Sequence, residues 1–96
     1  MRKRFRKPMP VVLKVTPLSK YRLLVTFATG ENKIYDASWV LTHPLTTELR
    51  DVSRFNKVYV LNGTVAWSKN LDLGPDDLYE NSIIVKKDDI KELMAG

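Results

Sequence analysis

The sequence contains no cysteine, and this absence excludes disulfide bonds, thiolate zinc sites and cysteine nucleophiles. It also fits a protein of the reducing cytoplasm, which is where we expect this chain. No uninterrupted apolar run approaches the roughly 20 residues that a membrane-spanning helix needs. The basic start is followed by Pro8 and Pro10 instead of the apolar core of a signal peptide. We therefore expect neither a membrane anchor nor a secretory signal.

Residues that carry chemistry are also scarce. The single histidine, His43, would need a nucleophile or an orienting carboxylate to act as a base, and because it precedes a proline in an expected loop we interpret it as a surface residue. The acidic pairs Asp76-Asp77 and Asp88-Asp89 stand where helices are expected to begin and lack the spacing of a calcium loop. The four glycines are too far apart to cradle a phosphate. We expect no catalytic residue, no metal and no cofactor, and therefore not an enzyme.

Positive charge is concentrated at the start of the chain. The formal net charge is +5, and five of the 16 basic residues fall within the first seven positions: Arg2, Lys3, Arg4, Arg6 and Lys7. The rest of the chain carries equal numbers of basic and acidic residues. We therefore divide the chain into a flexible basic arm, residues 1–10, and a single α+β domain, residues 11–96. The arm is a candidate nucleic-acid-binding segment, and its alternative interpretation is a solvated tail.

The most informative stretch runs from Lys57 to Ser68. Its centre, Asn62-Gly63, predicts a two-residue hairpin turn between two strands, because both turn positions need positive φ. Counting outward from this turn predicts three opposed pairs: Leu61 with Thr64, Val60 with Val65, and Val58 with Trp67. The valines and Trp67 then share one apolar face, which we expect to pack inward.

Three further strands are expected before this hairpin. The first spans Val11 to Thr16, with Val11, Leu13 and Val15 on one face, and is expected to end at Pro17. The second spans Tyr21 to Ala28 and the third Glu31 to Asp36, joined by a turn at Thr29-Gly30. If the turn has two residues, Ile34 lies opposite Val25. We expect an antiparallel meander from this part of the chain.

Helical patterns occupy most of the remaining sequence. Residues 37–56 predict two short, irregular helical segments with Leu45, Leu49, Val52 and Phe55 facing a core. Residues 71–82 predict a compact helix with Gly74 as its N-cap and Pro75 at its first position. Ile83 to Val85 is an expected edge strand. A short terminal helix follows, with Ile90, Leu93 and Met94 forming an apolar stripe that is too short to be stable alone.

Several motifs together resemble the bacterial domain-of-unknown-function family twenty-four forty-two, over about positions 11 to 84. The residues that carry this resemblance are Val15-Thr16-Pro17-Leu18, Tyr21 to Phe27, Gly30-Glu31, Tyr35-Asp36, Glu48 to Asp51, Phe55, Gly63 to Trp67, Asp72-Leu73 and Leu78-Tyr79-Glu80. Two departures are Ser68 and Asn70, where the family often has proline and glycine. Some relatives continue into a helix-turn-helix domain.

The resemblance implies a small α+β fold with mostly antiparallel strands and no established enzymatic activity. Small members of the family are commonly encoded beside other short proteins, in arrangements like toxin–antitoxin pairs, which implies a role in binding a partner. We therefore expect a sheet built from two hairpins plus an N-terminal strand, with short helices packed on it. The sequence leaves homo-oligomer formation open.

Two sets of residues are candidates for binding that partner. The first is a surface formed by Trp67, Asp72, Tyr79 and Glu80, whose alternative interpretation is that the aromatic residues belong to the core and its rim. The second is the stripe of Ile90, Leu93 and Met94. Our leading hypothesis is thus a non-catalytic protein-interaction or regulatory module, an antitoxin-like partner of another small protein. The alternative is a nucleic-acid-binding protein that uses the basic arm.

Overall fold

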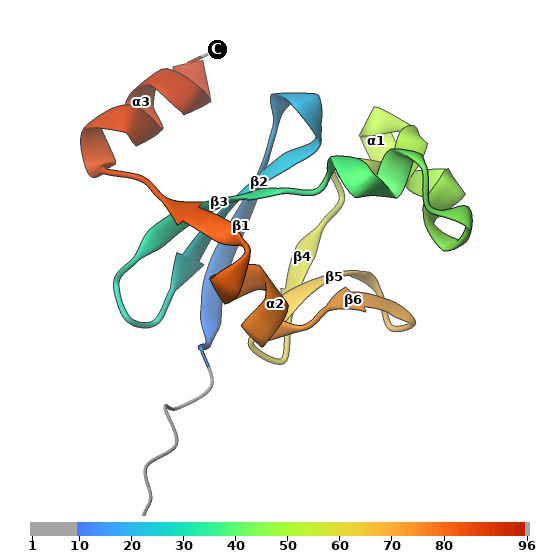
Figure 1. Ribbon diagram of the computed structural model, residues 1–96, viewed down its shortest axis with the longest axis horizontal. Coiled ribbons are helices and arrows are strands. Elements are labelled where there is room, and N and C mark those ends of the chain that lie inside the picture. The colour runs from blue at the N-terminus through green and yellow to red at the C-terminus, as the bar shows by residue number, and fades with distance from the viewer. Residues whose placement is uncertain (1–9, 96) are drawn as a thin grey trace, which may run out of the picture.

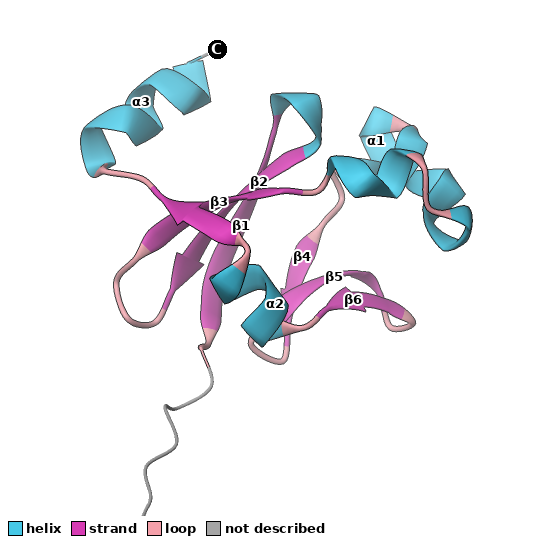
Figure 2. Ribbon diagram, in the orientation of Figure 1, coloured by secondary structure: helices cyan, strands magenta, loops and turns pink. Residues whose placement is uncertain are grey.

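Alternating apolar side chains explain the central strand of the fold. In β2 (Arg22–Phe27), the side chains of Leu23, Val25 and Phe27 point to one face and are completely buried. The computed structural model describes residues 10–95 and arranges them in two antiparallel sheets with several short helices (Figure 1 and Figure 2). The predicted α+β class is confirmed.

The two sheets divide the chain unequally. The larger has the order β1-β2-β3-β7, and its strands besides β2 are β1 (Val12–Leu18), β3 (Asn32–Asp36) and β7 (Ser82–Ile84). β7 pairs with β3. The smaller has the order β4-β5-β6, with bounds Tyr59–Leu61, Thr64–Ser68 and Leu71–Leu73. The two predicted hairpins therefore belong to different sheets. The strand β6 was not expected, because residues 71–73 were assigned to the following helix.

The hairpin of β4 and β5 forms as predicted. Leu61 lies opposite Thr64 and Val60 opposite Val65. The third predicted pair, Val58 with Trp67, is not part of the ladder, because β4 begins one residue later, at Tyr59. Asn62 and Gly63 have φ of 51° and 80°, the left-handed values that the turn requires. The Val12 amide donates a 2.8 Å hydrogen bond to the Gly63 carbonyl oxygen. This bond joins the hairpin to β1, so the two sheets are directly connected.

The register between β2 and β3 differs from the prediction by one residue. Ile34 lies opposite Leu24, and Lys33 takes the expected place opposite Val25. The reason is a three-residue turn, since the Gly30 amide donates to the Phe27 carbonyl oxygen and the Phe27 amide to that of Glu31. Gly30 provides the positive φ of 94° that this turn needs. Because a one-residue shift exchanges the two faces of a strand, Lys33 and Tyr35 lie on the core side.

The predicted end of the first strand is wrong. β1 continues through Pro17 to Leu18, and Pro17 lies opposite Leu23. Proline is tolerated here because β1 is an edge strand of its sheet, so the missing N–H interrupts no ladder on the free side. A bulge between Val12 and Lys14 also changes the faces, so Val12 is buried while Leu13 is exposed.

Residues 38–55 form three short helical segments: η2 (Ser38–Leu41), η3 (Pro44–Arg50) and α1 (Val52–Phe55). Leu49 and Phe55 are buried as predicted, whereas Leu45 is 79% exposed and Val52 is 55% exposed. The i, i+4 spacing of Leu45 and Leu49 fails because η3 is an irregular 3-10 segment, in which residues four apart do not share a face. The i, i+3 spacing of Val52 and Phe55 fails at Val52, the first residue of the four-residue helix α1.

The chain ends with two helices around β7. Gly74 is the N-cap of α2 (Pro75–Glu80) and Pro75 its first residue, as predicted. Leu78 on α2 is completely buried. The edge strand β7 leads into α3 (Lys87–Ala95), which lies at the periphery of the fold (Figure 1). The core consists of Val12, Leu23, Val25, Phe27, Tyr35, Ala37, Val40, Leu49, Phe55, Val58, Val65, Leu73 and Leu78.

Candidate functional site

Trp67 connects the smaller sheet to α1. Its side chain is half-buried, and the indole Nε1–H donates a 2.9 Å hydrogen bond to the Phe55 carbonyl oxygen. The Trp67 and Phe55 rings lie 5.6 Å apart and are tilted by 40°. Both the polar and the apolar part of Trp67 are therefore engaged within the fold, which favours the interpretation that it belongs to the core and its rim.

Tyr79 connects α2 to the hairpin of β2 and β3. Its ring meets that of Phe27 edge to face at 5.1 Å, and its hydroxyl donates a 2.6 Å hydrogen bond to Glu31 Oε1. The Lys33 ammonium lies 3.8 Å from the centre of the same ring and donates to the Tyr79 carbonyl oxygen. Trp67 and Tyr79 thus contact different elements. Asp72 on β6 and Glu80 at the end of α2 are exposed.

The hydrogen bond between Tyr79 and Glu31 moves the pKa values of the two side chains further apart. The bonds from Tyr79 and Thr29 lower the pKa of the Glu31 carboxyl below its ordinary value. The bond to Glu31 raises the pKa of the Tyr79 hydroxyl. At neutral pH the carboxylate stays ionised and the phenol stays protonated. The pair therefore acts as a structural clamp between α2 and the β2–β3 turn and does not transfer a proton at that pH.

A small open cavity of about 180 Å³ lies where the turn η1 (Ser19–Tyr21) meets α1. Leu18, Tyr21 and Phe55 form its apolar wall, and Lys20 and Asn56 contribute polar groups. Lys20 and Tyr21 have backbone φ angles of 61° and 57°, which residues other than glycine rarely adopt. The Tyr21 hydroxyl donates a hydrogen bond to the Arg50 carbonyl oxygen, which holds this turn against η3. Its lining residues come from two segments that are far apart in the sequence, so no local pattern predicts the cavity.

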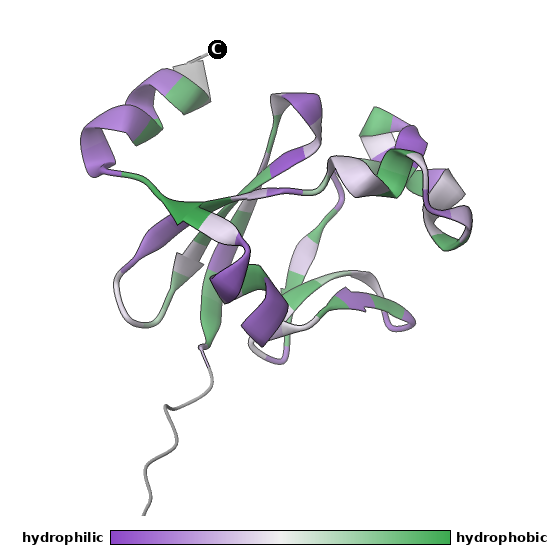
Figure 3. Ribbon diagram, in the orientation of Figure 1, coloured by the Kyte–Doolittle hydropathy of each residue, from purple (hydrophilic) through white to green (hydrophobic). Residues whose placement is uncertain are grey.

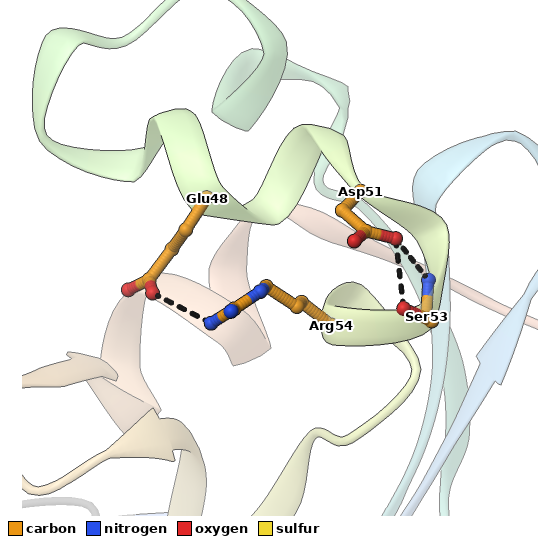
Figure 4. Close-up of polar contacts among 4 residues, drawn as sticks. All are labelled: Glu48, Asp51, Ser53 and Arg54. Atoms are coloured by element: carbon orange, nitrogen blue, oxygen red, sulfur yellow. Dashed lines mark hydrogen bonds and ion pairs between the residues drawn. The ribbon is translucent and has the colours of Figure 1, made fainter.

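The acidic and basic residues of η3 and α1 have structural roles (Figure 4). Asp51 is the N-cap of α1, and its carboxylate accepts hydrogen bonds from the Ser53 hydroxyl and amide, which lower the pKa of the Asp51 carboxyl. Arg54 and Glu48 form an exposed ion pair at 3.5 Å. His43 is exposed, as predicted, and its Nδ1 accepts a hydrogen bond from the Leu45 amide at 3.1 Å.

The largest exposed apolar residues near the chain end lie on β7. Ile83 is 74% exposed and Ile84 is 58% exposed, on a strand that forms the edge of its sheet among the described residues (Figure 3). On α3, Ile90 and Leu93 are half-buried, and the side chain of Met94 lies outside the described part. The edge of β7 together with Ile90 and Leu93 is called the β7–α3 surface below.

The basic residues Arg2, Lys3, Arg4, Arg6 and Lys7 lie outside residues 10–95, which the structure describes. Within those residues, no group of three or more histidine or acidic side chains is placed to hold a metal ion. In the same part of the chain, no helix has the length and apolar character needed to cross a membrane.

These features define a small α+β domain built from two antiparallel sheets. The chain belongs to the DUF2442 family, because the family model described as "Protein of unknown function (DUF2442)" matches residues 12–83. This match confirms the resemblance seen in the sequence. It begins at the first residue of β1 and ends within β7, so α3 lies beyond it. No curated protein and no solved structure matches the chain.

Proposed function

We propose that this protein is a non-catalytic protein-interaction module that binds another small protein chain, a different protein or a second copy, through the β7–α3 surface. The observation that supports this proposal most directly is the exposure of Ile83 and Ile84 on an edge strand. An edge strand presents backbone N–H and C=O groups to which an incoming strand can bond. Apolar side chains beside such an edge add a hydrophobic contribution to binding.

The terminal helix supports the same proposal. α3 has nine residues, fewer than an isolated helix needs to be stable in water. Ile90 and Leu93 on this helix are only half-buried. A partner that covers these two side chains would bury apolar area and stabilise the helix at the same time.

A finer form of the proposal is an antitoxin-like role, in which the module masks the surface of a small toxic protein. Its support is the resemblance to family members that are encoded beside other short proteins. The Glu31–Tyr79 pair is consistent with a non-catalytic role, because its pKa shifts keep both groups in their usual protonation states at neutral pH.

The test is purification of the tagged full-length chain from its native host, with two variants compared. Ile83→Lys places a charge on the β7 edge, whereas Leu45→Lys changes an equally exposed leucine on η3 and serves as the matched control. We expect a stoichiometric protein partner with the unchanged chain and with the control, and its loss with Ile83→Lys. If neither a different protein nor a second copy of the chain is recovered with the unchanged chain, the proposal is contradicted.

A second candidate function is nucleic-acid binding by the arm, supported by its five basic residues. Such binding would weaken steeply with salt, because each phosphate contact releases counterions. DNA and RNA binding is measured over a range of salt concentrations with the full chain and with residues 1–7 removed. Equal binding by the two proteins contradicts this function.

A further inference from the structure

We propose that the protein occupying the β7 edge is a second copy of this chain, paired antiparallel about Ile83 so that the two larger sheets form one continuous eight-stranded sheet. This inference rests on the proposed function, because it names the partner of the same edge. Its support comes from three features of β7: the direction of its backbone groups, the apolar row that it completes and the charges on either side of it.

The direction of the backbone groups fixes which residues can bond to an incoming strand. The Val85 amide donates a 2.9 Å hydrogen bond to the Asn32 carbonyl oxygen. Hydrogen-bonded and non-hydrogen-bonded pairs alternate along an antiparallel ladder, so Ile83 also bonds toward β3. The N–H and C=O groups of Ser82 and Ile84 therefore point to the outer side of β7.

These outward groups are complementary to themselves. When a second β7 lies antiparallel and is centred on Ile83, Ser82 of each copy faces Ile84 of the other. Each such pair exchanges two hydrogen bonds, which satisfies all the outward groups of both residues. A twofold axis then passes beside Ile83, as a symmetric dimer requires.

The same register continues an apolar row across the sheet. Leu24 lies opposite Ile34, and Ile34 lies opposite Ile83, so the three side chains share one face. Exposure increases along this row, from 7% at Leu24, through a half-buried Ile34, to 74% at Ile83. Pairing about Ile83 places the two Ile83 side chains next to each other and covers the exposed end of both rows.

The charges on either side of β7 match this arrangement. Glu80 stands three residues before Ile83 and Lys86 three residues after it, and both side chains are exposed. Antiparallel pairing about Ile83 places the start of β7 in each copy, which follows Glu80 on α2, beside the end of β7 in the other copy, which precedes Lys86. Opposite charges are then brought to the same end of the paired strands on both sides of the axis, which favours antiparallel pairing.

The absence of cysteine from the chain allows a direct test by cross-linking. Ile83→Cys places two thiols in a non-hydrogen-bonded pair, whose Cα separation of about 4.5 Å lies within the range of a disulfide. Ile84→Cys is the matched control, because its two Cα atoms are offset along the strands and lie more than about 7 Å apart. Under mild oxidation we expect the Ile83→Cys full-length chain to form covalent dimers about tenfold or more faster than Ile84→Cys.

A second measurement uses the mass of the cysteine-free full-length protein in solution, from sedimentation equilibrium. We expect the unchanged chain and Leu45→Lys to be dimers, and Ile83→Lys to be a monomer with an unchanged circular dichroism spectrum. Glu80→Lys should weaken the dimer, and the charge exchange Glu80→Lys with Lys86→Glu should restore it, which a merely structural role of either residue would not produce.

The outcomes separate this inference from the proposed function. If the unchanged chain is a monomer, or if the two cysteine variants cross-link at equal rates, a second copy does not occupy the β7 edge and this inference is overturned. If a different protein is then lost from the Ile83→Lys purification, the proposed function stands. If neither a second copy nor a different protein depends on Ile83, both are overturned.

Discussion

The Lys33 ammonium lies 3.8 Å from the centre of the Tyr79 ring and donates a hydrogen bond to the carbonyl oxygen of the same residue. Lys33 is on β3 and Tyr79 is on α2, so this contact holds the helix against the sheet. The Lys33 side chain is only 8% exposed. A lysine is rarely buried to this extent without a partner, and here the ring and the carbonyl oxygen together provide one.

We predict that Lys33→Ala lowers the free energy of unfolding by about 2 kcal/mol, because it removes a buried stem and leaves the Tyr79 carbonyl oxygen with only the 3.3 Å hydrogen bond from the Ser82 hydroxyl. Lys33→Met keeps most of the packing and should cost less. Urea denaturation measures both. Lys69→Ala removes an exposed lysine from a turn and is the control, with an expected change within about 0.5 kcal/mol. An equal effect of the Lys33→Ala and Lys69→Ala substitutions would show that the contact does not stabilise the fold.

The Glu31–Tyr79 hydrogen bond predicts a dependence of stability on pH at both ends of the scale. Because folding lowers the pKa of Glu31, its contribution is present above the ordinary carboxyl value of 4.5 and is lost as the pH falls through the lowered pKa. Because folding raises the pKa of Tyr79, its contribution is present below the ordinary value of 10.0 and is lost as the pH rises through the raised pKa.

The measurement for this pair is an NMR titration of the Glu31 carboxyl carbon in the unchanged chain and in Tyr79→Phe. We expect the pKa of Glu31 to rise toward its ordinary value in the variant, because the strongest of the bonds that lower it is removed. Thr29→Val removes the second donor and should raise the pKa by less. An unchanged pKa in Tyr79→Phe would contradict the role assigned to this bond.

Lys33 also marks the limit of what the sequence predicts about the fold. The alternation of residues 21–28 and the Asn62-Gly63 turn identified β2, β4 and β5 correctly, because local chemistry decides both. The length of the turn after Phe27 was not decided locally, and one additional residue placed Lys33 on the core side. The short strand β6 was missed because its partner, β5, and not its own sequence, determines its conformation.

We predict that Gly63→Ala lowers the free energy of unfolding by about 1–2 kcal/mol, because Gly63 has a φ of 80° that disfavours a side chain. An added Cβ would also lie 3.4 Å from Val11 Cγ1. Gly63→Asn introduces the same Cβ contact, yet asparagine tolerates this backbone conformation better. In thermal denaturation we expect Asn to cost less than Ala. Equal costs would assign the effect to the contact with Val11 instead of the backbone.

We predict the opposite sign at Lys20, on the wall of the cavity at η1. Its φ of 61° means that Lys20→Gly should raise the free energy of unfolding by up to about 1 kcal/mol. Lys20→Ala removes the same amine but keeps the backbone penalty, so it should give no gain. For a domain of this size, 1 kcal/mol corresponds to about 4–8 °C in the melting temperature, which calorimetry resolves. A gain from Ala as large as that from Gly would refute the backbone explanation.

The candidate site was predictable only in part. The exposed position of Ile83 and Ile84 follows from an edge strand that the sequence identified, since an apolar run after a helix suggested it. The grouping of Trp67 with Tyr79 on one surface depended on their closeness in sequence. Their hydrogen bonds connect them to different elements, Trp67 to Phe55 and Tyr79 to Glu31, and such long-range partners leave no local pattern.

The position of β7 has a consequence for how the chain folds. β3 ends at Asp36 and β7 begins at Ser82, so the whole of the smaller sheet is made between two strands that finally lie side by side. Closing such a long intervening segment is entropically costly and slows the pairing. On the ribosome, β3 must therefore keep one edge unpaired until the chain has been synthesised beyond β7. During that interval, the unpaired edge of β3 can pair wrongly with other nascent chains that are being translated from the same mRNA.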